Sequence, residues 1–270
     1  MIYLASVELR QLPDGRSLAF PFSVPAIAAW AGGRIELRSE VTFLVGENGS
    51  GKSTFLEGIA CAAHSIAVGT AEVERDPTLR AGQALARWLR LSWARKTRRG
   101  FYMRAEDFFG YAQRMQRMRD ELEAEARAIH DDATISEKAR GFALQPYARE
   151  LGGIRERYGE GLDARSHGES FLALFQSRFV PDGLYLLDEP EAPLSPTRQL
   201  SLIAMMKTMV AEEGAQFVIA THSPILMSFP GAAILSFDGG AIQEVPYRDV
   251  EHVTVTRQFL NDPDSFLRHL

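Results

Sequence analysis

The stretch that decides the fold runs from Val41 to Thr54 and reads Val-Thr-Phe-Leu-Val-Gly-Glu-Asn-Gly-Ser-Gly-Lys-Ser-Thr. It opens with a short continuous apolar run, Val41 to Val45, which is typical of a strand buried on both faces of a sheet. The segment from Gly46 to Ser53 then has the spacing G-x-x-x-x-G-K-[ST]. A helix is expected to begin near Lys52. This order of strand, glycine-rich loop and helix predicts a phosphate-binding loop in an α/β domain.

Each residue type in this loop has a physical task. Glycines let backbone N–H groups turn toward phosphate oxygens, and the positive end of the following helix points at the same anion. Lys52 reaches the β- and γ-phosphates, and Ser53 supplies an oxygen to Mg²⁺. We therefore predict ATP and Mg²⁺ as ligands; the alternative is a glycine-rich turn without a ligand. The residues predicted to bind the nucleotide here are Gly46, Glu47, Asn48, Gly49, Ser50, Gly51, Lys52, Ser53 and Thr54.

A second apolar run, Leu184 to Leu187, ends in the acids Asp188 and Glu189. Strands of an α/β sheet present their carboxyl ends at the edge where ligands bind. Asp188 is therefore predicted to hold Mg²⁺, directly or through water. Glu189 is predicted to polarise the attacking water as a general base. An ordinary pair of acids at a strand end is the alternative interpretation.

Two further segments complete the predicted site. His222 follows the apolar strand Phe217 to Ala220, where it can contact the γ-phosphate with support from Thr221 or Ser223. The run Ser166-His167-Gly168-Glu169-Ser170 precedes an apolar helical stretch and offers a hydroxyl, a glycine backbone and a helix N-terminus to an anion. Taken alone, the run could be a helix cap with an acidic first turn.

The order of these motifs along the chain resembles that of the ATP-binding-cassette ATPases. Within them it is most similar to the soluble branch related to SMC and RecF proteins, and to small stand-alone bacterial ATPases of the AAA type. The residues that carry the resemblance are Gly-Glu-Asn-Gly-Ser-Gly-Lys-Ser-Thr, Ser-His-Gly-Glu-Ser and Asp-Glu-Pro-Glu.

The resemblance implies how such a chain works. Two subunits would sandwich two ATP molecules, with Ser166, Gly168 and Glu169 of one subunit contacting the γ-phosphate bound to the other. The segment from Glu191 to Pro196 would lie at that dimer interface, and His222 would be the histidine switch. Catalysis would rest on Glu189, His222 and Lys52, and the metal would be bound by Ser53 and Asp188.

Two family features have no clear counterpart. Transport ATPases carry a glutamine that senses Mg²⁺; residues 102–109 occupy about that place, and Gln113 is a weak candidate. No aromatic residue is clearly placed to stack on adenine, because Phe20, Phe22 and Trp30 are expected in the core.

The same patterns predict the domain organisation. The fold class is α/β, a P-loop domain of the ABC ATPase type whose mixed sheet is joined by an antiparallel N-terminal strand region. Residues 1–70 and 164–270 are expected to form this core, with turn chemistry at Leu12 to Gly15 indicating an early hairpin. Residues 71–163, rich in Arg, Glu, Ala and Met, are expected to form a helical insertion that is too short for the long coiled coils of SMC proteins.

Composition limits the cellular setting. Apolar residues make up 46% of the 270, so a sizeable core can form, and the net charge of −5 argues against a general polyanion binder. One cysteine, Cys61, excludes an intramolecular disulfide, and neither a signal peptide nor a membrane span is indicated. We therefore expect a cytoplasmic protein.

One basic segment suggests a partner. Arg95, Lys96, Arg98 and Arg99 cluster with further arginines among Trp88, Trp93, Phe101 and Tyr102. Cations can follow phosphates while aromatic rings stack on bases, which favours nucleic acid; a solvated surface and a protein contact are the alternatives. The expected function is ATP hydrolysis coupled to nucleic-acid maintenance or defence. The alternatives are a nucleotide-controlled module that regulates a partner effector and, with less support, the ATPase subunit of a transporter.

Overall fold

The computed structural model describes residues 1–12, 19–67, 76–132, 134–158 and 167–268. The chain divides into two compact units, residues 1–105 with 180–270, and residues 106–179. The helical unit therefore begins later and ends later than the predicted insertion of residues 71–163. The later beginning arises because residues 76–105 contain two strands of the first unit, β4 (Leu89–Trp93) and β5 (Gly100–Arg104). The arginines and aromatic residues of these strands give the segment a composition that resembles that of helices.

A six-stranded sheet forms the centre of the first unit, in the order β5-β6-β7-β3-β8-β9. Its strands are β3 (Val41–Val45), β5 (Gly100–Arg104), β6 (Leu184–Asp188), β7 (Gln216–Ala220), β8 (Ala233–Ser236) and β9 (Gln243–Glu244). Five strands run parallel, and β9 runs antiparallel to β8. Every residue of β3, β6 and β7 is buried, which explains their continuous apolar sequences.

A smaller antiparallel sheet, β2-β1-β4, confirms the predicted N-terminal strand region. It consists of β1 (Leu4–Leu9), β2 (Arg34–Glu36) and β4 (Leu89–Trp93). The predicted hairpin turn falls mostly on residues 13–18, outside the described residues, and β1 pairs with the more distant β2 and β4. Gln216 joins the two sheets, since its side-chain oxygen accepts hydrogen bonds from the N–H groups of Tyr3 and Leu4, both at 2.9 Å.

Helices surround the sheets of this unit. They are α1 (Pro25–Trp30), α2 (Lys52–Ala62), η3 (Pro77–Leu79), α3 (Arg80–Ala86), α7 (Pro196–Glu213), α8 (Pro224–Met227), η4 (Asp238–Gly240), η5 (Tyr247–Asp249), α9 (Glu251–Asn261) and α10 (Pro263–Leu267). The helix α7 begins after Ser195 and ends at Gly214, which takes the left-handed conformation common for a C-terminal glycine. Two glycines let α2 and α3 approach closely, because a Cβ on Gly58 would meet Leu85 and one on Gly82 would meet Glu57.

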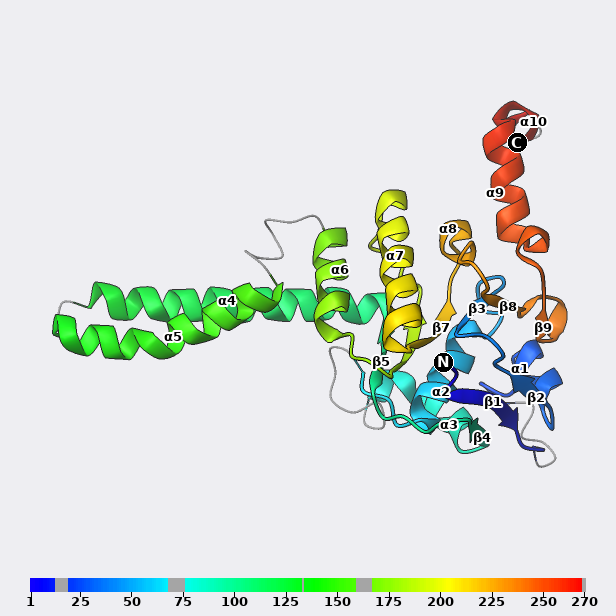
Figure 1. Cartoon of the computed structure of the whole chain (residues 1–270), viewed down its shortest axis with the longest axis horizontal. Coiled ribbons are helices and arrows are strands. Elements are labelled where there is room, and N and C mark those ends of the chain that lie inside the picture. The colour runs from blue at the N-terminus through cyan, green and yellow to red at the C-terminus, as the bar shows by residue number, and fades with distance from the viewer. Residues whose placement is uncertain (13–18, 68–75, 133, 159–166, 269–270) are drawn as a thin grey trace. The chain divides into compact units, whose positions relative to one another are not determined.

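The second unit is helical. It contains α4 (Ala105–Asp131), α5 (Glu137–Tyr158) and α6 (His167–Arg178). Figure 1 shows α4 and α5 as two long helices side by side, and Tyr147 of α5 hydrogen-bonds Glu125 of α4. None of the helices in the described parts of the two units combines the length and the apolar character that crossing a bilayer requires.

Candidate functional site

The phosphate loop connects β3 to α2, and its backbone depends on glycine. Gly46, Gly49 and Gly51 have φ angles of 142°, 79° and 106°, which side chains rarely tolerate. A Cβ on Gly46 would also lie 2.8 Å from an oxygen of Asp238. Gly51 begins α2 without a capping side chain, so the first N–H groups of this helix face an anion site.

Lys52 lies inside the loop. Its ammonium group donates hydrogen bonds to the carbonyl oxygens of Gly46 at 2.7 Å and Glu47 at 2.9 Å. Burial lowers the pKa of Lys52, although the carboxylates of Glu189, Asp188, Asp238 and Glu47 act in the opposite direction. The loop thus places one desolvated cation where the β- and γ-phosphates of a nucleotide would bind.

Asp188 and Ser53 meet at the carboxyl edge of the sheet. The Ser53 hydroxyl donates to Asp188 Oδ1 at 3.2 Å. Asp188 is only 7% exposed, and burial, with a smaller contribution from Glu189, raises its pKa to about 7. One carboxylate and one hydroxyl suit Mg²⁺, which takes few protein ligands and completes its shell with water and substrate phosphates. A dedicated cluster of three or more acidic, histidine or cysteine ligands does not occur among the described residues.

Glu189 and His222 lie on neighbouring strand ends. Because β6 and β7 are parallel, Asp188 is in register with Ala220, and the Glu189 N–H donates to the Ala220 carbonyl at 2.9 Å. Glu189 has a φ of 51°, and its Oε1 lies 3.7 Å from His222 Nε2. The Glu189 and His222 side chains are 46% and 27% exposed, but Nε2 of His222 is itself buried and has no hydrogen-bond partner in the described part of the chain.

A polar network behind this pair was not predicted. Glu191 Oε1 accepts from the His222 N–H at 2.7 Å, and burial raises the pKa of the Glu191 carboxyl, which Thr221 also contacts. The Ser223 hydroxyl donates to Gln199 Oε1 at 2.5 Å. Thr221 and Ser223 therefore support the histidine loop as expected, with partners that the local sequence does not reveal.

Two more residues near the site were missed. Asp238, in the β8–β9 connection, accepts a hydrogen bond from the Glu47 N–H at 2.8 Å and so braces the phosphate loop. His252, on α9, contacts His222 with 2.9 Å between Nε2 of His252 and Nδ1 of His222. Neither residue belongs to a local motif, so only the tertiary fold brings them to the site.

The predicted ABC signature, Ser166 to Glu169, belongs to a different part of the sequence from the strand ends and the phosphate loop. Ser166 falls outside the described residues, whereas Gly168 and Glu169 belong to the beginning of α6 in the second unit. The role of this segment remains a prediction, as does that of the segment from Glu191 to Pro196.

The basic segment differs from the expectation. Arg95 and Arg99 lie 4.0 and 3.6 Å from the carboxylate of Asp182, yet their side chains remain 59% and 60% exposed, and Lys96 and Arg98 are exposed in the same β4–β5 loop. Arg104 is buried beside Asp76 at 3.7 Å and is in register with Asp188, so it does not belong to this surface. The four aromatic residues pack inward: Phe101 and Tyr102 are buried, and Trp88 and Trp93 pack partly buried against the core.

The residues considered for stacking on adenine and for sensing Mg²⁺ lie in different surroundings. Phe22 and Trp30 lie in the core as expected, but Phe20 is 66% exposed, contrary to prediction. Tyr102 is buried in β5, and the side chain of Gln113 on α4 lies outside the described parts.

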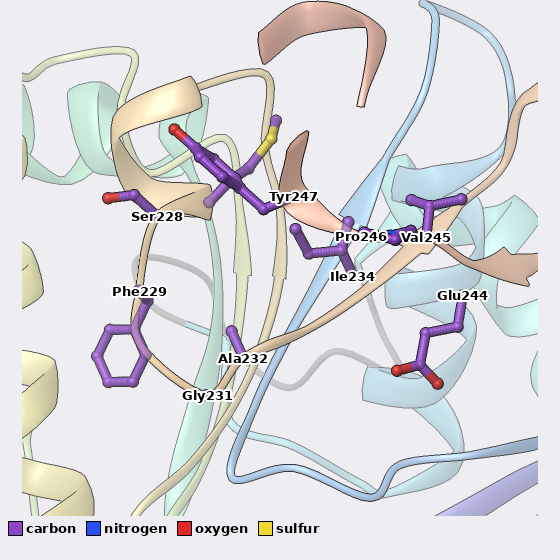
Figure 2. A pocket seen from close by; sticks show the side chains of 10 residues that line it. Ser228, Phe229, Gly231, Ala232, Ile234, Glu244, Val245, Pro246 and Tyr247 are labelled. Carbon is purple, nitrogen blue, oxygen red and sulfur yellow. The ribbon is translucent and has the colours of Figure 1, made fainter. Parts of the chain in front are cut away.

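Two hollows lie near the histidine loop and the elements that follow it. One, of about 620 Å³, is bounded by α7, α8 and α9 and includes His222, Glu191 and Arg257 in its lining. The other, of about 530 Å³, lies between the α8–β8 connection and β9. Figure 2 shows Tyr247 and Phe229 beside the second hollow, with Glu244 as its charged group.

Parts of the chain are similar to known proteins. Residues 170–228 match the family model described as "AAA domain, putative AbiEii toxin, Type IV TA system". The chain is 28% identical, over 67% of its length and 70% of the relative, to the thiamine import ATP-binding protein ThiQ of Ruegeria sp. (strain TM1040). Among solved structures, cbiO1 from Clostridium perfringens, part of the ABC transporter complex cbiONQ, gives a TM-score of 0.49 at 15% identity and full coverage of both chains. A putative metal-chelate type ABC transporter gives 0.49 at 16% identity, covering 96% of this chain and 90% of that one.

The phosphate loop and the strand-end acids are features of P-loop ATPases of the AAA/ABC type, to which parts of the chain are similar. The fold is α/β and is built on a mixed sheet.

Proposed function

We propose that the chain hydrolyses ATP to ADP and phosphate with the help of Mg²⁺. The observation that carries this proposal is that the ends of β3, β6 and β7 bring four polar side chains together. The hydroxyl of Ser53, which follows β3, lies 3.2 Å from Oδ1 of Asp188 at the end of β6. Oε1 of Glu189, which follows β6, lies 3.7 Å from Nε2 of His222, which follows β7. These groups suit a metal-bound γ-phosphate and an attacking water.

Each residue then has a task in the reaction. The loop N–H groups and Lys52 hold the β- and γ-phosphates and neutralise the charge that develops during transfer. Glu189 accepts a proton as the water oxygen bonds to the γ-phosphorus, and the bond to the β–γ bridging oxygen breaks to release ADP. His222 Nε2 donates to a γ-phosphate oxygen, and bound Mg²⁺, held by Ser53 and Asp188, would neutralise the bridging charge.

A second copy of the chain would complete the site. The resemblance of Ser166 to Glu169 to the ABC signature supports contact with the γ-phosphate bound to a partner subunit. Such a dimer would close on ATP and open after hydrolysis, a two-state switch governed by the γ-phosphate.

The process coupled to hydrolysis has three candidates. Exposed Lys96 and Arg98 support nucleic acid, as expected for the soluble SMC/RecF-like branch, although Arg95 and Arg99 face Asp182. The hollow beside His222 supports instead a partner effector controlled by the nucleotide. The name of the ThiQ relative supports a transporter subunit, which would act with a separate membrane protein.

The test is the steady-state ATPase rate, measured with and without linear duplex DNA at low and moderate salt. We expect Lys52→Ala to abolish turnover and Lys207→Ala, at an exposed position on α7, to retain it. DNA stimulation that falls with salt and is lost in Lys96→Glu/Arg98→Glu, but not in Lys207→Glu, would establish nucleic acid as the partner. Turnover that persists in Lys52→Ala would refute the proposed site, whereas a rate indifferent to DNA would shift the search to a protein partner.

A further inference from the structure

The ring of His222 is held by a second histidine. His222 Nδ1 and His252 Nε2 are 2.9 Å apart, and the two ring centroids are 4.8 Å apart with the planes inclined at 59°. The other nitrogen of His222, Nε2, faces Glu189. The two nitrogens of this ring thus have separate surroundings, one toward α9 and one toward the catalytic edge.

A contact of 2.9 Å between two imidazole nitrogens requires one donor and one acceptor. If His222 Nδ1 carried the proton, its neutral ring would turn the lone pair of Nε2 toward the Glu189 carboxylate and a phosphate oxygen, both of which are acceptors. If His252 donates instead, His222 carries its proton on Nε2 and can donate toward that side. The second arrangement pairs Nδ1 and leaves the Nε2–H, which has no hydrogen-bond partner in the described part of the chain, available to a phosphate oxygen.

The helix that carries His252 is well anchored. Val250 and Val253, on either side of it in the sequence, are 4% and 2% exposed. Just before α9, the Tyr247 hydroxyl donates to the Pro224 carbonyl of α8 at 3.0 Å. These contacts fix the His252 ring relative to the strand end that carries His222.

We propose that His252 is a positioning residue for hydrolysis, which sets the tautomer and orientation of His222 so that Nε2–H points toward the γ-phosphate. This inference rests on the proposed ATPase function. Its consequence is that α9 tunes turnover through this histidine ring without contacting the nucleotide.

Substitutions of His252 test the inference through the split between kcat and KM. His252→Ala should lower kcat for ATP about 10-fold or more and leave KM within about twofold, because ATP binding depends on the phosphate loop. His252→Gln, whose amide can donate to Nδ1, should restore much of the loss. Val253→Ala, which loosens the same helix without touching the ring, is the matched control and should change kcat far less.

An activity-independent measurement separates this inference from the proposed function. In ¹⁵N-histidine-labelled protein, assigned with His222→Gln, the His222 ring should show a protonated Nε2 and an unprotonated Nδ1. His252→Ala should shift it toward a mixture of tautomers, and His252→Gln should keep the wild-type state. An unchanged His222 tautomer in His252→Ala would overturn the inference, as would equal losses of kcat in Val253→Ala and His252→Ala. A wild type without Lys52-dependent turnover would overturn the proposed function, and the tautomer would still decide the role of His252.

Discussion

Replacing Asp188, which we propose holds Mg²⁺, should stabilise the nucleotide-free protein. Burial raises the pKa of Asp188 to about 7 from 3.8, so the folded protein binds this proton more tightly than the unfolded chain does. The ionised carboxylate therefore opposes folding increasingly as the pH rises from about 4 to about 7. Each pKa unit corresponds to about 1.4 kcal/mol, so the ionised Asp188 lowers the free energy of unfolding by about 2 kcal/mol at about pH 5.5 and by about 4 kcal/mol at about pH 8.5.

Asp188→Asn removes the charge and keeps the shape and an acceptor for the Ser53 hydroxyl. We expect it to raise the free energy of unfolding by up to those amounts, measured by urea denaturation in EDTA without nucleotide across that pH range. Glu189→Gln, which removes a charge from a half-exposed position, should change the stability by about 0.5 kcal/mol or less. Asp188→Asn should also lose the stabilisation that Mg²⁺ and ATP confer on the wild type. A variant no more stable than the wild type at about pH 8.5, or a difference that does not grow with pH, would refute the reasoning.

Three further substitutions test the site and the fold. Glu189→Gln should retain ATP binding, slow hydrolysis by about two orders of magnitude or more and accumulate an ATP-bound dimer in size-exclusion chromatography; hydrolysis at the normal rate would exclude Glu189 as the base. Ser166→Arg should bind ATP with unchanged affinity but stay monomeric in the same experiment, and an unchanged dimer would reject the signature assignment. Gly100→Ala should cost about 3 kcal/mol or more in thermal denaturation, because φ is 104° and a Cβ would collide with the Leu184 backbone; a Tm within a few degrees of the wild type would contradict the β5–β6 packing.

The parallel centre of the fold could be predicted because its strands are buried on both faces. That burial makes β3, β6 and β7 continuous apolar runs, and polar residues follow each run at the carboxyl edge. The positions of Lys52, Asp188 and His222 at this edge could therefore be predicted from the sequence, and their chemical roles stay predictions.

The strands β4 and β5 could not be predicted in the same way. The strand β4 mixes polar and apolar residues, most of which are only half-buried. The strand β5 begins at a glycine and ends in the buried Arg104. Their arginines, placed next to helical sequence, resemble a charged helix face. The ion pair of Arg104 with Asp76 is what allows a cation inside the fold, and such a pair between distant segments leaves no local signal.

The same reasoning explains which parts of the site were missed and why they matter. Lys52, Glu189 and His222 follow β3, β6 and β7, three strands that are adjacent in the sheet, so the hydrogen bonds of the sheet fix their spacing. His252 is held differently, by the packing of Val250 and Val253 and the Tyr247 hydrogen bond. A perturbation of the strand ends must disrupt the central sheet, whereas a displacement of α9 needs to break only these local contacts. Regulation of turnover that leaves the fold intact is therefore expected to act through α9, which also borders the hollow beside His222.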